Sequence, residues 1–321
     1  MIENIELKYK VGALLYSPAL NRKVADSIIA EKICRPYSLA LCLEDTIADD
    51  SVEFAEKQVG VTLKRLLEAR SGKDFYMPMI FIRVRSCEQL LRLWEELVDC
   101  SELITGFIFP KYSIGNADSY NGVMRKINSE AKRTVYMMPI LESRDIVEYS
   151  TRHTVLSDLK NKIDSVKDLV LNIRVGGNDF SNEFAARRHY DETIYDILPI
   201  SQLLGDILTV FSREYVVSGP VWEFFSSDNE EWKRGLRNEL KLDKVNGFIG
   251  KKAIHPKQIS VVNEALKVYH KDYEDAKEIL NWDETGLQVG KSFAGERMNE
   301  VKTHINWAYK TITLAEIYGV N

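Results

Sequence analysis

The residues best suited to chemistry in this sequence of 321 residues follow a strand-like stretch from Leu169 to Glu183, LVLNIRVGGNDFSNE. Its apolar first half predicts a buried strand, and Gly176 and Gly177 then allow the backbone to bend sharply. Asn178 and Asp179 come directly after the glycines. A carboxylate just past the C-terminal end of a parallel strand is where α/β enzymes place reactive groups. The structural alternative is that Asp179 only caps the next helix.

Polar side chains also follow most of the other strand-like segments of the chain. They are Glu44, Asp45, Arg83, Arg85, Lys111, Glu142, Trp222, Glu223, Lys251, Lys252 and His255. If the strands are parallel, these side chains meet at one end of the sheet, in a cleft able to hold a metal ion and an anion. Any one of them alone is more simply structural, but their recurrence at most strand ends favours a functional site.

Eight strand-like runs alternate with segments of helical periodicity. The runs cover residues 13–18, 38–45, 79–84, 106–111, 134–142, 169–179, 214–222 and 247–256. Each interval is long enough for one crossover helix, as in 51–69 and 87–98, where apolar residues return every three or four positions. Eight such units predict a closed (β/α)₈ TIM barrel of the α/β class. Because no G-x-G-x-x-G follows the first run, a dinucleotide-binding fold loses support.

The C-terminal part of the chain leaves the barrel pattern. We expect one helix over 256–280, a glycine-containing loop over 282–296 and a final amphipathic helix over 297–318. The expected division is therefore a barrel over 1–256 and a helical extension over 257–321, acting as a lid or an oligomer contact. The final helix would place Glu300 and His304 four positions apart on one face, where a surface ion pair is the simplest interpretation.

Composition and charge restrict the class of ligand. Hydrophobic residues make up 45% and charged residues 28% of the chain, and the net charge is -5 without a long Lys/Arg run, so we expect no nucleic-acid partner. We find neither a signal-peptide pattern nor an apolar stretch of bilayer length, which predicts a cytoplasmic protein without a membrane partner. The four cysteines lack CxxC spacing and are expected to be reduced thiols. A small molecule is the expected ligand.

Several of these segments together resemble the HpcH/HpaI aldolase and citrate lyase β-subunit superfamily. The matching motifs are LYSPA (15–19), LCLEDTI (41–47), FIRVRS (81–86), FPK (109–111), ILES (140–143), GGNDF (176–180), GFIGKKAIHPKQI (247–259) and GERMNE (295–300). The resemblance covers nearly the whole chain, and the segment 247–259 is its most specific match. The pair Arg187-Arg188, the segment SGPVWE and the terminal MNExxxHxxWA are most similar to the C-C bond lyase TIM-barrel branch associated with tellurium-resistance gene clusters.

The resemblance implies a role for each matching residue. Glu142 and Asp179 would be the carboxylate ligands of Mg²⁺ or Mn²⁺; Arg83, Glu44, Asp45 and Glu300 would be catalytic; Arg83, Lys111, Gly177, Asn178, Lys252 and Arg187 would bind substrate. Neighbouring strands lie roughly 5 Å apart, so two carboxylates at consecutive strand ends could reach one hard cation. A guanidinium fork at Arg83 would suit bidentate binding of a substrate carboxylate.

The implied reaction is metal-dependent C–C bond cleavage or condensation of an oxo-acid or related carboxylate. The metal would act as a Lewis acid on a developing enolate, and Glu300, His304 or a metal-bound water would serve as general base. The resemblance also implies a homo-oligomer, a trimer or hexamer, whose C-terminal segment reaches a neighbour. Arg174, Arg187, Arg188 and Lys111 form a further basic set that suggests a phosphate or polycarboxylate, unless the helical arginines pair with Glu183 or Asp191.

Two alternatives stay open. One is a CoA-thioester lyase or hydrolase of the citrate lyase or malyl-CoA type. Against it, Gly12, Ala13 and Ala19 stand where CoA-using relatives have arginine, serine and glycine. The other is a non-catalytic barrel subunit of a stress-linked complex. A scaffold has no reason to place carboxylates at neighbouring strand ends, which argues against this reading.

Overall fold

The computed structural model describes residues 2–283 and 285–321, with side chains described from Glu6 onward. The chain divides into two compact units. The larger is Val11–Val262, and the smaller combines the segment up to Lys10 with Asn263–Asn321. The boundary between them falls within helix α11 (Lys257–Leu266). The role of the C-terminal segment as a lid or oligomer contact stays a prediction.

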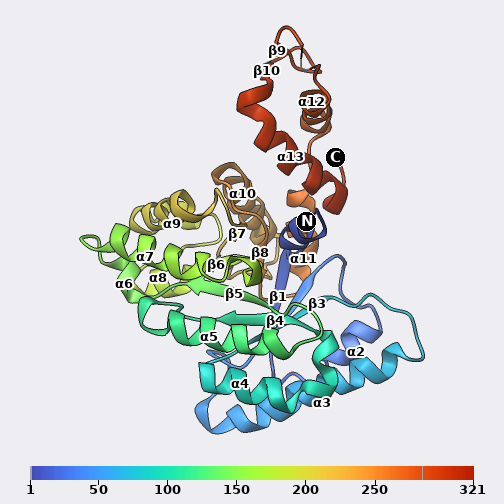
Figure 1. Ribbon diagram of the computed structural model, residues 1–321, viewed down its shortest axis with the longest axis vertical. Coiled ribbons are helices and arrows are strands. Elements are labelled where there is room, and N and C mark those ends of the chain that lie inside the picture. Colours follow the sequence, from blue (N-terminus) through green and yellow to red (C-terminus); the bar gives the residue numbers. More distant parts are fainter. Residues whose placement is uncertain (1, 284) are drawn as a thin grey trace. The chain divides into compact units, whose positions relative to one another are not determined.

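The larger unit is built on one eight-stranded parallel sheet in the order β7-β6-β5-β4-β3-β2-β1-β8 (Figure 1). The strands are β1 (Ala13–Pro18), β2 (Ser38–Cys42), β3 (Met79–Arg83), β4 (Ile104–Phe109), β5 (Tyr136–Leu141), β6 (Ile173–Val175), β7 (Val217–Ser218) and β8 (Lys251–Ala253). The two ends of the sheet meet where Gly219 bridges Lys251 and where the Ile249 N–H donates to the Val217 carbonyl at 2.8 Å. The predicted (β/α)₈ TIM barrel is confirmed.

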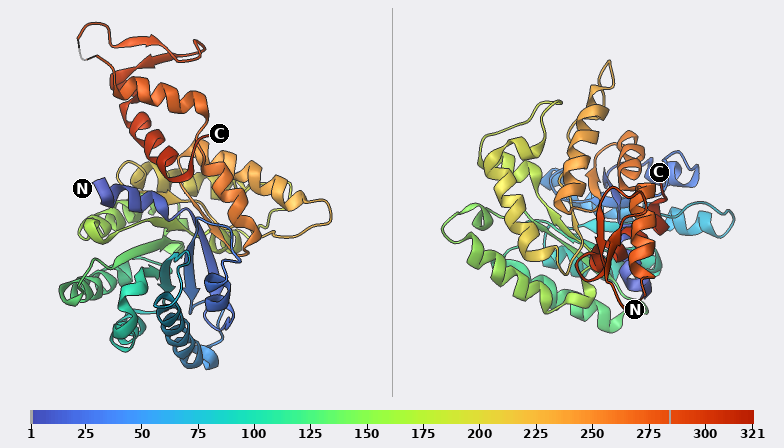
Figure 2. Two further views of the ribbon diagram at one scale, coloured as in Figure 1. Left: turned by 90° about the vertical axis from the view of Figure 1, so that its right-hand side faces the viewer. Right: turned by 90° about the horizontal axis from the view of Figure 1, so that it is seen from above.

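Helices lie outside the strands, as Figures 1 and 2 show. They are α2 (Val24–Ile29), α3 (Val52–Arg70), α4 (Cys87–Glu96), α5 (Ile114–Glu130), α6 (Arg144–Val147), α7 (Arg152–Asp164), α8 (Gly177–Glu183), α9 (Leu198–Phe211) and α10 (Glu231–Asn246). In α9 the buried residues recur every three or four positions, from Ile200 through Leu203, Leu204 and Ile207 to Phe211. This spacing forms one apolar face, which packs toward the barrel core.

Strand lengths differ from the predicted runs at the later strands. The first run coincides with β1, whereas β6 covers only Ile173–Val175 of the predicted 169–179. It is shorter because α8 begins at Gly177, so the turn that carries Asp179 belongs to a helix. The β7 strand is limited to Val217–Ser218 of the predicted 214–222. The reactive turn therefore starts earlier in the chain than the apolar run suggested.

The smaller unit contains α1 (Ile2–Lys10), α12 (His270–Leu280), the antiparallel pair β9 (Val289–Lys291) and β10 (Met298–Glu300), and α13 (Val301–Tyr318). Ala276, Ile279 and Ala308 form its small core. The Tyr318 hydroxyl donates to the Tyr9 carbonyl at 2.7 Å, which ties α13 to α1. None of the helices within the described residues is long and apolar enough to span a bilayer.

Three expectations for this segment were wrong. The single helix over 256–280 is two helices, because Val268 leaves the helical path and forms a parallel bridge with Val320. The loop over 282–296 contains β9, and the final helix begins at Val301 because residues 298–300 pair with that strand. Alternating strand signals of three residues are too short to be distinguished from a loop in the sequence.

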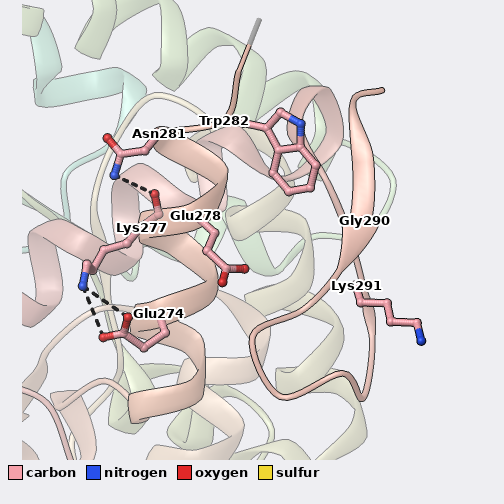
Figure 3. Close-up of a pocket in the computed structure, with 7 residues that line it drawn as sticks. All are labelled: Glu274, Lys277, Glu278, Asn281, Trp282, Gly290 and Lys291. Carbon is pink, nitrogen blue, oxygen red and sulfur yellow. Dashed lines mark hydrogen bonds and ion pairs between the residues drawn. The ribbon is translucent and has the colours of Figure 1, made fainter. Parts of the chain in front are cut away.

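A hollow of the smaller unit lies between α12 and β9 (Figure 3). Trp282 closes one side, and a Cβ at Gly290 would lie 2.7 Å from its ring, so the strand approaches the indole closely. On the other side Lys277 pairs with Glu274 at 3.2 Å. These charges neutralise each other at the surface, and the hollow is best explained by packing of the hairpin on the helix.

Candidate active site

Arg83 at the end of β3 is the centre of a cluster of carboxylates. Its side chain is 2% exposed. Nη2 lies 2.7 Å from Glu44 Oε2 and 3.3 Å from Glu142 Oε1, and Nη1 lies 3.1 Å from Asp45 Oδ2. One guanidinium thus links residues that follow β2 and β5. Three carboxylates occupy its terminal nitrogens, and its role as a substrate clamp stays a prediction.

Glu142 is held rigidly at the end of β5. Oε1 also accepts the Lys111 backbone N–H at 3.1 Å, and Gly176 leaves room for the rest of the side chain. A Cβ at Gly176 would lie 2.2 Å from Glu142 Cβ and 2.6 Å from Oε2. Burial raises the pKa of Glu142 to about 7; Arg83 opposes this rise and Asp179 adds to it. The carboxylate therefore lacks enough positive charge to offset its burial.

Glu142 lines a small cavity inside the barrel, together with several other predicted residues. Of the residues predicted from the sequence to form the site, those that line this cavity are Glu142, Gly177, Asn178, Asp179 and Lys252. Tyr16 and Arg174 line the same cavity. The structure thus brings the proposed metal ligands and part of the proposed substrate-binding set to one place.

The residues at this cavity fit a hard divalent cation. Among the described residues no group of three or more His, Cys, Asp or Glu side chains forms a protein-only metal cage. Two carboxylates at one cavity suit Mg²⁺, which is commonly held by one or two carboxylates and keeps several waters. The raised pKa of Glu142 shows that a positive charge beside it would be stabilising.

The loop after β2 carries Glu44 and Asp45 and is fixed by Arg85. The Arg85 Nε donates to the Leu43 carbonyl at 2.6 Å, Nη2 donates to the Ile47 carbonyl, and Nη1 lies 2.5 Å from Asp49 Oδ1. Arg85 therefore acts on the loop and not on the cavity.

Lys111 lies across the acids of this loop, with a positive φ of 47°. Its Nζ is 3.4 Å from Glu44 Oε1 and 3.9 Å from Asp45 Oδ1. Burial raises the pKa of Glu44, whereas the pKa of Asp45 is lowered because the contacts with Glu44, Arg83 and Lys111 outweigh its burial. Glu44 therefore holds a proton more tightly than the adjacent Asp45.

Lys251 and Arg188 are not part of the site, which corrects two expectations. Lys251 is fully buried and pairs with Glu239 at 2.9 Å and Asp243 at 2.7 Å, both on α10. Arg188 is also buried and lies 3.2 Å from Glu239. The Tyr195 hydroxyl completes this network by donating to Asp243 at 2.6 Å. Alternation along β8 turns Lys251 outward toward the helices while Lys252 faces the cavity.

Arg187 and the strand-end residues Trp222 and His255 lie outside the cavity lining. Arg187 is exposed and pairs with Glu223 at 3.4 Å, so its role in substrate binding stays a prediction. Trp222 is fully buried. The His255 ring stacks on Phe225 with centroids 4.8 Å apart.

Glu300 belongs to β10 of the smaller unit and precedes α13. Its backbone N–H donates to His304 Nδ1 at 2.9 Å. His304 thus caps the start of the helix, in place of the helical-face arrangement expected for these two residues. The catalytic role of Glu300 stays a prediction.

Tyr16 was missed by sequence reasoning. Its signal was a phenol within the apolar run ALLYSP, where a polar tip in a barrel strand needs a partner. Arg174 was noted only as part of a basic set. A guanidinium inside the apolar stretch LVLNIRV is a comparable signal, because charged groups are rarely buried without a partner.

An eight-stranded α/β barrel in which acids and bases converge on a cavity at the C-terminal strand ends has the architecture of a barrel enzyme. The chain belongs to the family described as C-C bond lyase of the TIM-barrel fold, whose model matches residues 5–320. The predicted family is confirmed, and the protein is a carbon–carbon lyase.

Solved structures of low sequence identity share the fold. CitE from Mycobacterium tuberculosis in complex with magnesium, acetoacetate and coenzyme A is 17% identical with a TM-score of 0.61, covering 96% of this chain and 99% of that one. RipC from Yersinia pestis is 16% identical with a TM-score of 0.55, covering 80% and 95%. The M. tuberculosis citrate lyase β subunit complexed with oxaloacetate and magnesium is 17% identical with a TM-score of 0.53, covering 81% and 98%. No curated protein matches the chain significantly.

Proposed function

We propose that this protein is a Mg²⁺- or Mn²⁺-dependent C–C bond lyase or aldolase that acts on an oxo-acid or related carboxylate. The observation that supports it is the placement of Glu142 and Asp179 on one cavity, where burial and the charge of Asp179 raise the pKa of Glu142 to about 7. Glu142 and Asp179 would hold the metal ion, which would supply Lewis-acid chemistry at the cavity.

The side chains of the barrel would hold and orient the reactants. Arg83 keeps Glu44, Asp45 and Glu142 in fixed positions, and the lowered pKa of Asp45 keeps its carboxylate ionised at neutral pH. Buried walls around Glu142 exclude bulk water and strengthen electrostatic interactions within the cavity. Fixed dipoles and charges of this kind stabilise a developing negative charge without reorganisation.

The solved structures of similar fold are consistent with this proposal. Their descriptions include magnesium with acetate, pyruvate, acetoacetate and oxaloacetate, all of them small carboxylates. One also contains coenzyme A, so a CoA-thioester lyase is the second candidate. Against it, Ala19 directly after β1 places a methyl group where CoA-using relatives have glycine.

The metal assignment is tested by titrating the protein with Mn²⁺ and following free Mn²⁺ by electron paramagnetic resonance. Glu142→Gln and Asp179→Asn should each weaken binding by about 100-fold or more, because each removes one of two carboxylate ligands. Glu214→Gln is the matched control, since Glu214 is exposed and pairs with Lys160 and Lys167. Stoichiometric Mn²⁺ binding retained in both ligand variants would refute the assignment.

The reaction is tested by incubating the Mg²⁺-loaded protein with pyruvate, oxaloacetate and glyoxylate and recording products by NMR. Cleavage or condensation should stop when EDTA removes the metal and return when Mg²⁺ is added. A protein that binds metal but converts none of these acids, alone or in pairs, would favour the non-catalytic barrel.

The remaining parts of the proposal concern assembly and setting. We propose a cytoplasmic homo-oligomer, a trimer or hexamer, in which Glu300 of the C-terminal segment serves a neighbouring site. A link to tellurium resistance is proposed from the family resemblance alone. A monomer by light scattering would exclude the shared site.

A further inference from the structure

Arg174 on β6 is a buried cation that no carboxylate among the described residues neutralises, and Tyr16 is the polar side chain that interacts with it. Its side chain is 2% exposed, and neither Nη1 nor Nη2 makes a hydrogen bond to any described residue. A buried charge without a partner is strongly unfavourable, so buried guanidinium groups are almost always paired. Arg174 lines the same cavity as Glu142 and Asp179. The unmet donors therefore belong to a residue that lines the space where a ligand would be.

Two further donor side chains line this cavity with Arg174. Tyr16 on β1 is 8% exposed, and its hydroxyl also makes no hydrogen bond to the described residues. The Lys252 Nζ lies 4.6 Å from the Tyr16 ring centroid, and both residues line the cavity. Three donors from β1, β6 and β8 thus line the same cavity as the two carboxylates.

Arg83 differs from Arg174 although both are buried within the same barrel. Glu44, Asp45 and Glu142 surround its terminal nitrogens at 2.7 to 3.3 Å. An incoming carboxylate at those nitrogens would have to displace an acidic side chain and bring a like charge beside it. At Arg174 it would displace no acidic side chain of the described residues.

We propose that Arg174, with Tyr16 and Lys252, binds a carboxylate group of the substrate. This inference rests on the proposed function and names the substrate class more closely, as an oxo-acid whose carboxylate enters the barrel toward β6. The planar guanidinium presents two parallel N–H donors to the two carboxylate oxygens, and the Tyr16 hydroxyl and Lys252 ammonium add donors beside them. The opposite end of the bound acid then faces Glu142 and Asp179.

The test measures calorimetric binding of pyruvate and of malonate, each with Mg²⁺ and again in EDTA. Arg174→Gln should weaken carboxylate binding by about tenfold or more in both conditions, and Arg174→Lys should restore part of it as a point charge. Tyr16→Phe should weaken it several-fold, and it keeps the ring that packs in the barrel. The matched control is Arg152→Gln, because Arg152 is also buried but pairs with Asp206 and two backbone carbonyls, so its removal should leave carboxylate affinity unchanged.

Several outcomes would overturn the inference. They are wild-type protein that binds neither acid in either condition, unchanged affinity in folded Arg174→Gln or in Tyr16→Phe, and binding of inorganic phosphate without binding of either carboxylate. Mn²⁺ affinity measured on the same variants keeps the two proposals apart. Arg174→Gln should leave Mn²⁺ affinity intact, whereas loss of Mn²⁺ binding belongs to Glu142→Gln and Asp179→Asn.

Discussion

Lys251 and Lys252 are consecutive residues of β8 with opposite surroundings. Lys251 lies outside the sheet, where Glu239 and Asp243 pair with it and Arg188 and Tyr195 complete the network. Lys252 lies inside, over Tyr16 and at the cavity that also contains the unpaired Arg174. In the outer network each charge has a partner within the protein. In the inner cluster, some hydrogen-bond donors have no acceptor among the described residues.

The difference indicates which buried charges serve the fold and which serve a ligand. In a paired network the buried charges neutralise one another within the folded protein. Such a network has no free donor or acceptor for a small molecule. An unsatisfied cluster lowers stability, and such a cost persists where binding or catalysis uses it. Changes on the two sides of β8 should therefore affect different properties of the protein.

The largest effect is expected from Lys251→Met. It leaves Asp243 and Glu239 buried with one cation fewer, and breaking a buried pair in this way costs about 3–5 kcal/mol in the free energy of unfolding. Burial already raises the pKa of Asp243 and Lys251 opposes that rise, so without Lys251 the folded pKa increases further. A carboxyl group with a raised folded pKa loses stability as pH increases, so the deficit should be larger at pH 8 than at pH 5.

Urea unfolding of Lys251→Met and wild-type protein at the two pH values measures this. A deficit below about 1 kcal/mol at pH 8 would mean that the network is not a significant source of stability. A deficit that shrinks as pH rises would contradict the assigned role of Asp243.

An intermediate effect is expected from Gly176→Ala. The added methyl group would lie 2.2 Å from Glu142 Cβ, so Glu142 must shift, and overpacking of this kind costs about 1–3 kcal/mol. Displacement of a proposed metal ligand should also weaken Mn²⁺ binding by roughly tenfold. Gly205→Ala on α9 is the control, because a Cβ there meets no atom within 4 Å and both properties should be retained. Wild-type Mn²⁺ affinity in Gly176→Ala would show that the position of Glu142 is not limiting.

The smallest effect on stability is expected from Lys252→Met. Burial lowers the pKa of Lys252, so removal of its charge relieves a desolvation cost, and the free energy of unfolding should change much less than in Lys251→Met. Urea unfolding beside Lys251→Met gives the comparison directly. A loss as large as that of Lys251→Met would mean that the inner lysine is a structural residue as well.

Much of the barrel could be predicted because apolar runs repeat with a helical segment between them. The first predicted run, 13–18, coincides with β1, and the acidic turns at Glu142 and Asp179 do reach one cavity, as parallel strand ends require. The short smaller-unit elements could not be predicted. Val268 leaves the helix because of a bridge to Val320, a contact between distant residues that local periodicity does not contain.

The pairing of Lys251 with the acids of α10 also could not be predicted from the sequence. Two lysines in succession give no sign of which one faces the barrel interior, since a shift of one residue in register exchanges them. Glu239 and Asp243 are spaced four apart on α10, which in the sequence is indistinguishable from an exposed acidic face. Only the register of β8 against β1 decides that Lys251 meets them.

The pairing of β1 with β8 has a consequence for synthesis of the chain. Strand β1, the first of the barrel to be synthesised, pairs on one side with β8, the last of the barrel, through Ala13 with Lys251 and Leu14 with Lys252. Until β8 emerges, that side of β1 remains an open edge able to pair with another nascent chain. The same late residue brings the cation that neutralises Glu239 and Asp243, so premature termination before Lys251 leaves a polypeptide with an open sheet and uncompensated acids. Such fragments are expected substrates for chaperones and proteases.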